Sequence, residues 1–155
     1  MNHSRVIKTL DNSGIEYTLH KYESDFIDTQ QSAQLIGVDL HHIVKTLVFR
    51  MPIGINVIML AGDSRIDSNK YKQLFKVDMH RLDKEDLKDY LGCEPGAVSP
   101  VGIKYKKAKV YMDESLKDID ELVYPSAGTL NSAISIAVGD LFTVCKCKSW
   151  IDISQ

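Results

Sequence analysis

The fold of this chain is decided by two stretches, Ile43-Val44-Lys45-Thr46-Leu47-Val48-Phe49 and Ile55-Asn56-Val57-Ile58-Met59-Leu60-Ala61. Both are rich in Val, Ile and Leu, which favour extended backbone. Pro52 and Gly54 lie between them, and these residue types are typical of a turn. The pattern predicts a central β-hairpin.

Before the hairpin, helical and extended patterns alternate. Residues 4–12 carry apolar side chains on one helical face and are followed by Ser13-Gly14, which indicates a helix that ends there. Residues 15–19 alternate between apolar and polar side chains, as a half-buried strand does. A second helix is expected from an N-cap at Thr29 to Gly37.

After the hairpin, Ser68 and Asp83 are each expected to cap a helix, and Gly92 closes the second of these helices. Helix signals then fade, apart from one short turn that opens at Gly139. The remaining apolar segments are predicted as strands at residues 109–112, 122–124, 133–137 and 150–153.

Helices interleaved with such strands predict an α+β fold. We expect a single domain, residues 1–155, with a curved, mostly antiparallel mixed sheet that is barrel-like and flanked by helices. The chain is 44% hydrophobic and 26% charged, a composition that folds around one core.

The composition also excludes several classes of protein. A formal charge of -2 and a pI near 6.2 exclude a protein that holds nucleic acid through a globally basic surface, so any RNA contact is local. The longest apolar run, residues 57–61, is too short to cross a membrane, and residues 1–10 do not resemble a signal peptide, so a cytoplasmic protein is expected. Cys93, Cys145 and Cys147 are expected to be reduced and to bind no zinc.

Lys45 is the first candidate for a functional residue, because it interrupts an apolar strand. Two interpretations stay open. The ammonium lies on a solvated face and has no role, or it is fixed in a site where it neutralises a phosphate or polarises a carbonyl.

Two loops are candidates for a binding site. Residues 92–102 contain three glycines and two prolines, which allow close approach of a ligand to the backbone and fix the loop's shape. Residues 124–129 offer small side chains and two hydroxyls. Each is also consistent with a simple connection between elements.

Other reactive residues form no recognisable catalytic set. Ser99 and Ser126 lie in no nucleophile-elbow motif, so no ordinary triad is predicted. The histidines are interpreted as surface or turn residues rather than metal ligands. The basic patch formed by Lys104, Lys106, Lys107 and Lys109 is either a phosphate contact or a solvated turn.

Four segments, taken in order, resemble the YbaK/EbsC family, and the resemblance covers nearly the whole chain. They are residues 45–49, 61–67, 96–102 and 126–128. The resemblance implies a freestanding relative of the editing domain inserted in bacterial prolyl-tRNA synthetases, which hydrolyses the ester of a wrong amino acid on tRNA.

The resemblance also implies roles for single residues. Lys45 is implied as the catalytic residue that binds the tRNA 3′ end, and residues 96–100 as the GxxxP loop that shapes the aminoacyl pocket. The implied substrate-binding residues are Tyr22, Thr46, Gly96, Ser99, Pro100, Ser126, Ala127 and Gly128. The implied partners are the 3′ acceptor end of aminoacyl-tRNA and prolyl-tRNA synthetase, with no cofactor and no metal.

The segments Lys45-Thr46 and Ser126-Ala127-Gly128 resemble the cysteine-editing branch more than the alanine-editing branch, which implies Cys-tRNA(Pro) or another small amino acid on tRNA(Pro). The chain departs from relatives at Ser24, where an acid or histidine is common, and at Ala133, which is acidic in the cysteine-editing branch. The alternative function is a non-catalytic module that binds aminoacyl-tRNA or a synthetase. A third is RNA binding through residues 104–109 alone.

Overall fold

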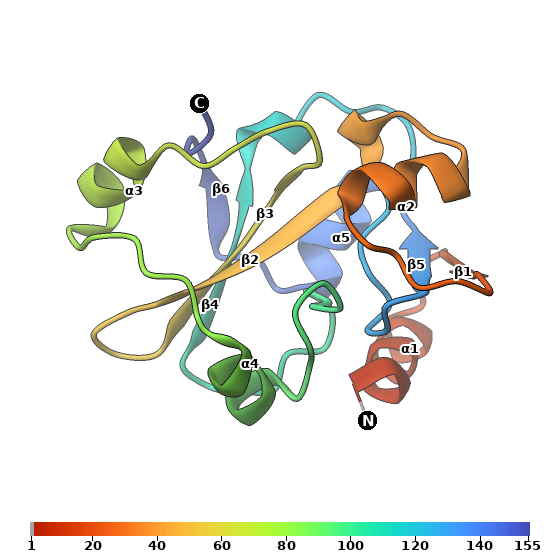
Figure 1. Ribbon diagram of the computed structural model, residues 1–155, viewed down its shortest axis with the longest axis horizontal. Helices are drawn as coiled ribbons and strands as arrows, with labels where there is room; N and C mark the ends of the chain where they lie inside the picture. Colours follow the sequence, from red (N-terminus) through yellow and green to blue (C-terminus); the bar gives the residue numbers. More distant parts are fainter. Residues whose placement is uncertain (1) are drawn as a thin grey trace.

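The computed structural model describes residues 2–155 and forms an α+β domain, in which five α-helices surround two β-sheets (Figure 1). The larger sheet has the strand order β2-β3-β4-β6, and the smaller pairs β1 with β5. Neither sheet closes into a barrel. In the part of the chain that the structure describes, the helices are too short or too polar to span a membrane.

The predicted hairpin is the centre of the larger sheet. β2 (Val44–Arg50) and β3 (Ile55–Ala61) pair antiparallel over their full lengths, and Lys45 lies opposite Leu60. All seven residues of β3 are buried, as expected for a strand covered on both faces. β2 is one of the two edge strands of this sheet, and its outer side hydrogen-bonds to Tyr124 near its start and to residues 80–82 near its end.

The expectation of mostly antiparallel strands is wrong for the larger sheet. β4 (Ala108–Asp113) runs parallel to β3, and β6 (Ser149–Ile151) runs parallel to β4. Long connections that contain helices separate these strands in the sequence. Such crossovers return the chain to the end of the sheet at which the previous strand began, so the next strand runs in the same direction.

The smaller sheet is an antiparallel pair, β1 (Thr18–Lys21) with β5 (Ser132–Ser135). A strand at residues 122–124 was expected, but only isolated bridges form there, from Tyr124 to Ile43 and from Val123 to Ile136. Pro125 follows and has no N–H to extend a ladder. These bridges link the smaller sheet to the start of β2.

The helices form where predicted, with shifts of one residue at two N-caps. Asp28, not Thr29, caps α2 (Thr29–Ile36), and Asp67, not Ser68, caps α3 (Ser68–Phe75). In both cases the carboxylate accepts backbone N–H groups of the first turn, as Asp83 does for α4 (Lys84–Leu91). α1 (Asn2–Ser13) matches its expected end, and α5 (Val138–Val144) is longer than the predicted turn.

Two apolar clusters cover the faces of the larger sheet. The larger cluster contains Val44, Val48 and Val57 together with residues of α1 and α5. The smaller contains Phe49, Ile58 and Tyr71 of α3. Because side chains alternate along β2, Lys45 shares a face with Phe49, whereas Thr46 shares the opposite face with Val44.

Candidate functional site

A cleft follows the edge strand β2 at its N-terminal end and divides into two chambers that share Thr29, Val44, Gly96 and Ser126. The lysine chamber, about 260 Å³, is lined by residues of β2 and by three other segments: Arg81-Leu82, Leu87, and the loop at residues 95–98. The tyrosine chamber, about 180 Å³, lies toward β5 and is lined in addition by Phe26, Ile27, Asp28, Ser32, Ile36, Ile43, Tyr124, Ser132 and Ala133.

Lys45 is half-buried in the wall of the lysine chamber. Its Nζ donates a hydrogen bond to the carbonyl oxygen of Ser64, and no carboxylate oxygen within residues 2–155 lies at ion-pair distance from it. Burial lowers the pKa of Lys45, as do the charges of Arg65 and Arg81, whereas Asp63 raises it. The ammonium therefore lies in a cationic environment that favours an anionic ligand.

Lys45 also lines a third, more open chamber on its other side. This arginine chamber, about 340 Å³, is bordered by Asp63, Ser64 and Arg65, and it contains Thr29 as well. Thr29 is therefore common to all three chambers. The Lys45 ammonium stands between a partly apolar cleft and a polar surface.

The GxxxP loop contacts the cleft mainly through its first residue. Gly96 lines both main chambers and has a φ of +83°, a conformation that favours glycine. Ser99 and Pro100 are buried, and the Ser99 hydroxyl accepts the N–H of Val101 at 3.3 Å. Neither lines the two chambers, so they shape the loop from behind.

The loop at residues 126–128 also presents one residue to the cleft. Ser126 lines both chambers, and its Oγ accepts the N–H of Gly128 at 3.1 Å. Ala127 is fully buried in the larger apolar cluster, and neither it nor Gly128 lines the two chambers. A direct contact of Ala127 or Gly128 with a ligand stays a prediction.

Thr46 lines the lysine chamber, and its buried Oγ1 has no hydrogen-bond partner within the described residues. A buried hydroxyl without a partner is unfavourable unless a ligand or water supplies one. Tyr22 lines neither main chamber. Its ring packs at 5.6 Å, centroid to centroid, against Phe26, which lines the tyrosine chamber.

Three residues that line these chambers, Thr29, Arg65 and Arg81, were not predicted from the sequence as site residues. Thr29 was interpreted only as a helix cap. Arg65 is part of segment 61–67, which resembles the YbaK/EbsC family, but no role was predicted for it. Nothing in the local sequence marks Arg81, which reaches the lysine chamber because its neighbour Leu82 donates its N–H to the carbonyl of Val48 in β2. Only folding brings these residues together.

The cysteines and histidines of the described residues do not line the two main chambers. Burial raises the pKa of Cys93 to about 11 and that of Cys147 to about 12, which keeps both thiols unreactive. His41 contacts Asp63 at 2.8 Å and His20 contacts Ser135 at 3.0 Å. Residues 2–155 contain no cluster of three or more Cys, His, Asp or Glu side chains suited to a metal ion.

The basic patch at residues 104–109 lies at the opposite end of the hairpin from Lys45. The Lys107 carbonyl accepts the N–H of Ile55, the residue with which β3 begins. Lys45, by contrast, pairs with Leu60 near the end of β3. The structure therefore separates the patch from the cleft.

The folds of solved proteins match this one closely. A candidate trans-editing enzyme for prolyl tRNA synthetase superposes with a TM-score of 0.89, covering 99% of this chain and 97% of that protein at 22% identity. The hypothetical protein APE2540 superposes with a TM-score of 0.86, covering 97% and 99% at 21% identity. These matches establish the fold.

Sequence relatives establish the family. The uncharacterized protein YwhH of Bacillus subtilis (strain 168) is 35% identical over 90% of this chain and 88% of its own length. Proline–tRNA ligase of Staphylococcus aureus (strain bovine RF122 / ET3-1) is 29% identical over 82% of this chain, which spans only 22% of the ligase. The family described as aminoacyl-tRNA editing domain matches residues 24–144. This chain is a member of the aminoacyl-tRNA editing domain family.

Proposed function

We propose that the chain, with residues 1–155 acting as one editing domain, hydrolyses the ester bond of a small amino acid wrongly attached to tRNA(Pro), with cysteine as the first choice. The observation that carries the proposal is the half-buried Lys45 ammonium, which has no carboxylate partner within residues 2–155 and lies between the lysine chamber and the arginine chamber. A phosphate of the tRNA 3′ end supplies the missing negative charge.

The size of the tyrosine chamber supports a small substrate side chain. Its volume of about 180 Å³ is well below the roughly 300 Å³ at which drug-sized ligand pockets begin. Gly96, Ser126 and Ala133 leave this space open. We assign the aminoacyl group to this chamber and the 3′-terminal phosphate to Lys45.

The reaction needs no protein nucleophile. Water, or a nucleophilic group of the substrate itself, attacks the carbonyl carbon, and the bond to the ribose oxygen breaks. In the water reaction, the amino acid leaves as a free acid and the ribose oxygen takes a proton. Because the aminoacyl ester is already activated, positioning and charge stabilisation supply most of the rate. The unpartnered Thr46 hydroxyl lines the lysine chamber, where the ribose or phosphate of the tRNA 3′ end supplies its missing partner.

A deacylation assay with cysteinyl-, alanyl- and prolyl-tRNA(Pro) tests the proposal. We expect hydrolysis of the cysteinyl and alanyl esters and sparing of the prolyl ester, whose ring and secondary amine have a different shape. Lys45→Ala is the control for a contaminating esterase. Cleavage of prolyl-tRNA at a comparable rate would contradict the assignment of the small chamber.

A second candidate is a module that binds aminoacyl-tRNA or prolyl-tRNA synthetase without turnover, because the Lys45 ammonium and the unpartnered Thr46 hydroxyl can bind a ligand without catalysing a reaction. The same assay separates the two. A binding module protects the ester from spontaneous hydrolysis, whereas a deacylase shortens its half-life. Adding prolyl-tRNA synthetase to the reaction tests whether that enzyme is a partner, through a change in rate.

A further inference from the structure

The segment of residues 62–67, called here the Ser64 loop, connects β3 to α3 and carries three groups that act on Lys45. The Ser64 carbonyl accepts the hydrogen bond from Nζ, the Arg65 guanidinium repels the ammonium, and the Asp63 carboxylate attracts it more weakly. The position of this loop therefore fixes both the place of the ammonium and its electrostatic surroundings.

The end of the Ser64 loop is held by residues 153–155. The Asp67 N–H donates to the Ile153 carbonyl at 2.8 Å, and the Gln155 N–H donates to the Arg65 carbonyl at 2.9 Å. A single antiparallel β-bridge lies between these contacts. The segment 153–155 lies outside residues 24–144, the span that matches the family.

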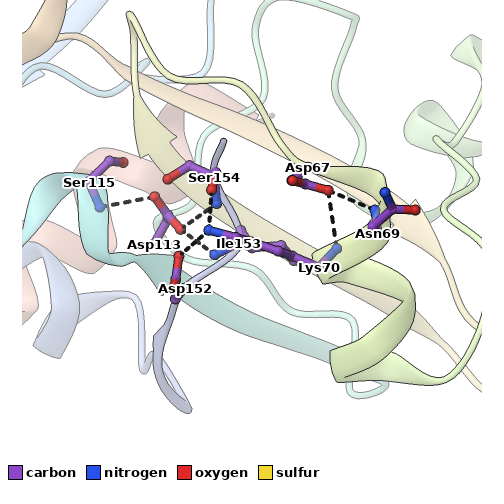
Figure 2. Close-up of polar contacts among 8 residues, drawn as sticks. All are labelled: Asp67, Asn69, Lys70, Asp113, Ser115, Asp152, Ile153 and Ser154. Atoms are coloured by element: carbon purple, nitrogen blue, oxygen red, sulfur yellow. Dashed lines mark hydrogen bonds and ion pairs between the residues drawn. The ribbon is translucent and has the colours of Figure 1, made fainter.

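Asp113, the last residue of β4, connects to both ends of the Ser64 loop. Its side chain is fully buried, and Oδ1 accepts the N–H groups of Ile153 at 2.8 Å and Ser154 at 3.2 Å (Figure 2). Oδ2 accepts the N–H of Ser115 at 2.9 Å. The Ser115 hydroxyl in turn accepts the N–H of Ala61 at 3.0 Å, where β3 ends and the loop begins.

We propose that Asp113 is a positioning residue for Lys45, because one buried carboxylate orders the support at both ends of the Ser64 loop. Its two oxygens satisfy three backbone donors, and a carboxylate can accept all of them. No side-chain atom of Asp113 lines the chambers around Lys45. Its expected effect on catalysis rests on the proposed function, whereas its effect on Lys45 can be measured without substrate.

Asp113→Asn tests the proposal, since it replaces one acceptor oxygen by an NH₂ group that meets a backbone N–H. We expect kcat/KM for the misacylated tRNA to fall about 10- to 100-fold, the scale of a small misplacement of a binding group. The pKa of Lys45 should rise toward its ordinary value, because the lowering effects of burial and of Arg65 lessen, and these are larger than the raising effect of Asp63 that is lost with them. A ¹³C NMR titration of the lysine Cε signals measures it, with Lys45→Arg identifying the resonance.

The matched control is Asp152→Asn, at an exposed carboxylate beside the same segment. Asp152 contacts Lys70 at 3.0 Å. Figure 2 shows that the backbone N–H groups of Ser115, Ile153 and Ser154 donate to Asp113 and not to Asp152. We expect this variant to keep kcat/KM within about two-fold of the wild type, as for an exposed ion pair, and to leave the pKa of Lys45 unchanged.

Two variants of Ser115 test the contact between Ser115 and Ala61, and they remain informative if Asp113→Asn fails to fold. Ser115→Ala removes the acceptor for the Ala61 N–H and is expected to lower kcat/KM about 3- to 10-fold, whereas Ser115→Thr keeps the hydroxyl and should stay within about two-fold. The proposal is overturned if folded Asp113→Asn or Ser115→Ala retains both wild-type activity and the wild-type pKa of Lys45.

If the wild-type protein deacylates no tRNA, the proposed function fails, and the positioning role is decided by the pKa of Lys45 alone. A raised value in Asp113→Asn or Ser115→Ala then supports the role, and an unchanged value overturns it.

Discussion

Two lysines in this molecule occupy opposite settings. Lys70 is a partly exposed residue of α3 that contacts the Asp152 carboxylate at 3.0 Å and the Ser154 carbonyl at 2.7 Å (Figure 2). Lys45 is half-buried, is repelled by two arginines and has only a neutral carbonyl as its hydrogen-bond partner in the described residues.

The pKa values shift in opposite directions for physical reasons. The hydrogen bond to Asp152 raises the pKa of Lys70, whereas burial lowers the pKa of Lys45. A charge whose partners lie within the protein contributes to the fold. A charge held in a cleft without such a partner indicates a site for a ligand, because its burial is unfavourable until a ligand compensates it.

The largest effect on activity is expected when the Lys45 ammonium is removed. Lys45→Ala should reduce deacylation on the order of 100- to 1000-fold, the usual effect of removing one preorganised charge-stabilising group. Thermal melting should change little, because the Lys45 ammonium forms no ion pair within residues 2–155. Lys45→Arg should fail as well, since a planar guanidinium does not replace a compact ammonium. Activity within a few-fold of the wild type would remove Lys45 from the mechanism.

Thr46→Val removes the hydroxyl that lacks a partner and keeps the shape of the side chain. We expect a loss of roughly 5- to 10-fold in kcat/KM, equal to about one net hydrogen bond, together with a free energy of unfolding that is unchanged or raised by about 1 kcal/mol. Steady-state kinetics and urea unfolding measure the two effects. A clear loss of stability would show instead that the Thr46 hydroxyl has a structural partner.

Lys70→Ala is expected to leave kcat/KM within about two-fold of the wild type and to lower the melting temperature slightly. The folded-state pKa of Lys70 is raised above its ordinary value of 10.5. Its stabilising contribution is therefore fully present below that value and is lost as the pH rises through the folded-state pKa. Melting curves of wild type and variant should converge at strongly alkaline pH. A constant difference across the whole pH range would exclude this linkage.

The smallest expected effect is that of a metal chelator. Neither lysine region contains a ligand set for a metal ion within residues 2–155, so exhaustive treatment with EDTA should leave deacylation unchanged. Lost activity that zinc restores would contradict the prediction.

Local signals were enough to predict the hairpin and most helix ends. The apolar stretches of β2 and β3 are separated by turn residues, and Gly37 and Gly92 adopt the left-handed conformation that ends a helix. The N-caps of α2 and α3 were displaced by one residue because both Asp28-Thr29 and Asp67-Ser68 offer two capping side chains in succession. Sequence alone does not decide between such neighbours.

The direction of strand pairing could not be predicted in this way. The segments that became β4 and β6 have ordinary strand composition, and their parallel pairing depends on where the intervening helices return the chain. The same limit applies to residues 122–124, which form only isolated bridges.

The sequence by itself determined the secondary structure around the hairpin, the family resemblance and the candidacy of Lys45, because propensity, turn chemistry and an interrupted apolar strand are local properties. Only the tertiary structure decided which of the predicted loop residues line the cleft, Gly96 and Ser126, and which do not, Ser99 and Ala127. Only the fold, likewise, connects Asp113 with the loop that holds Lys45, since those contacts join segments distant in sequence and depend on how the strands pack.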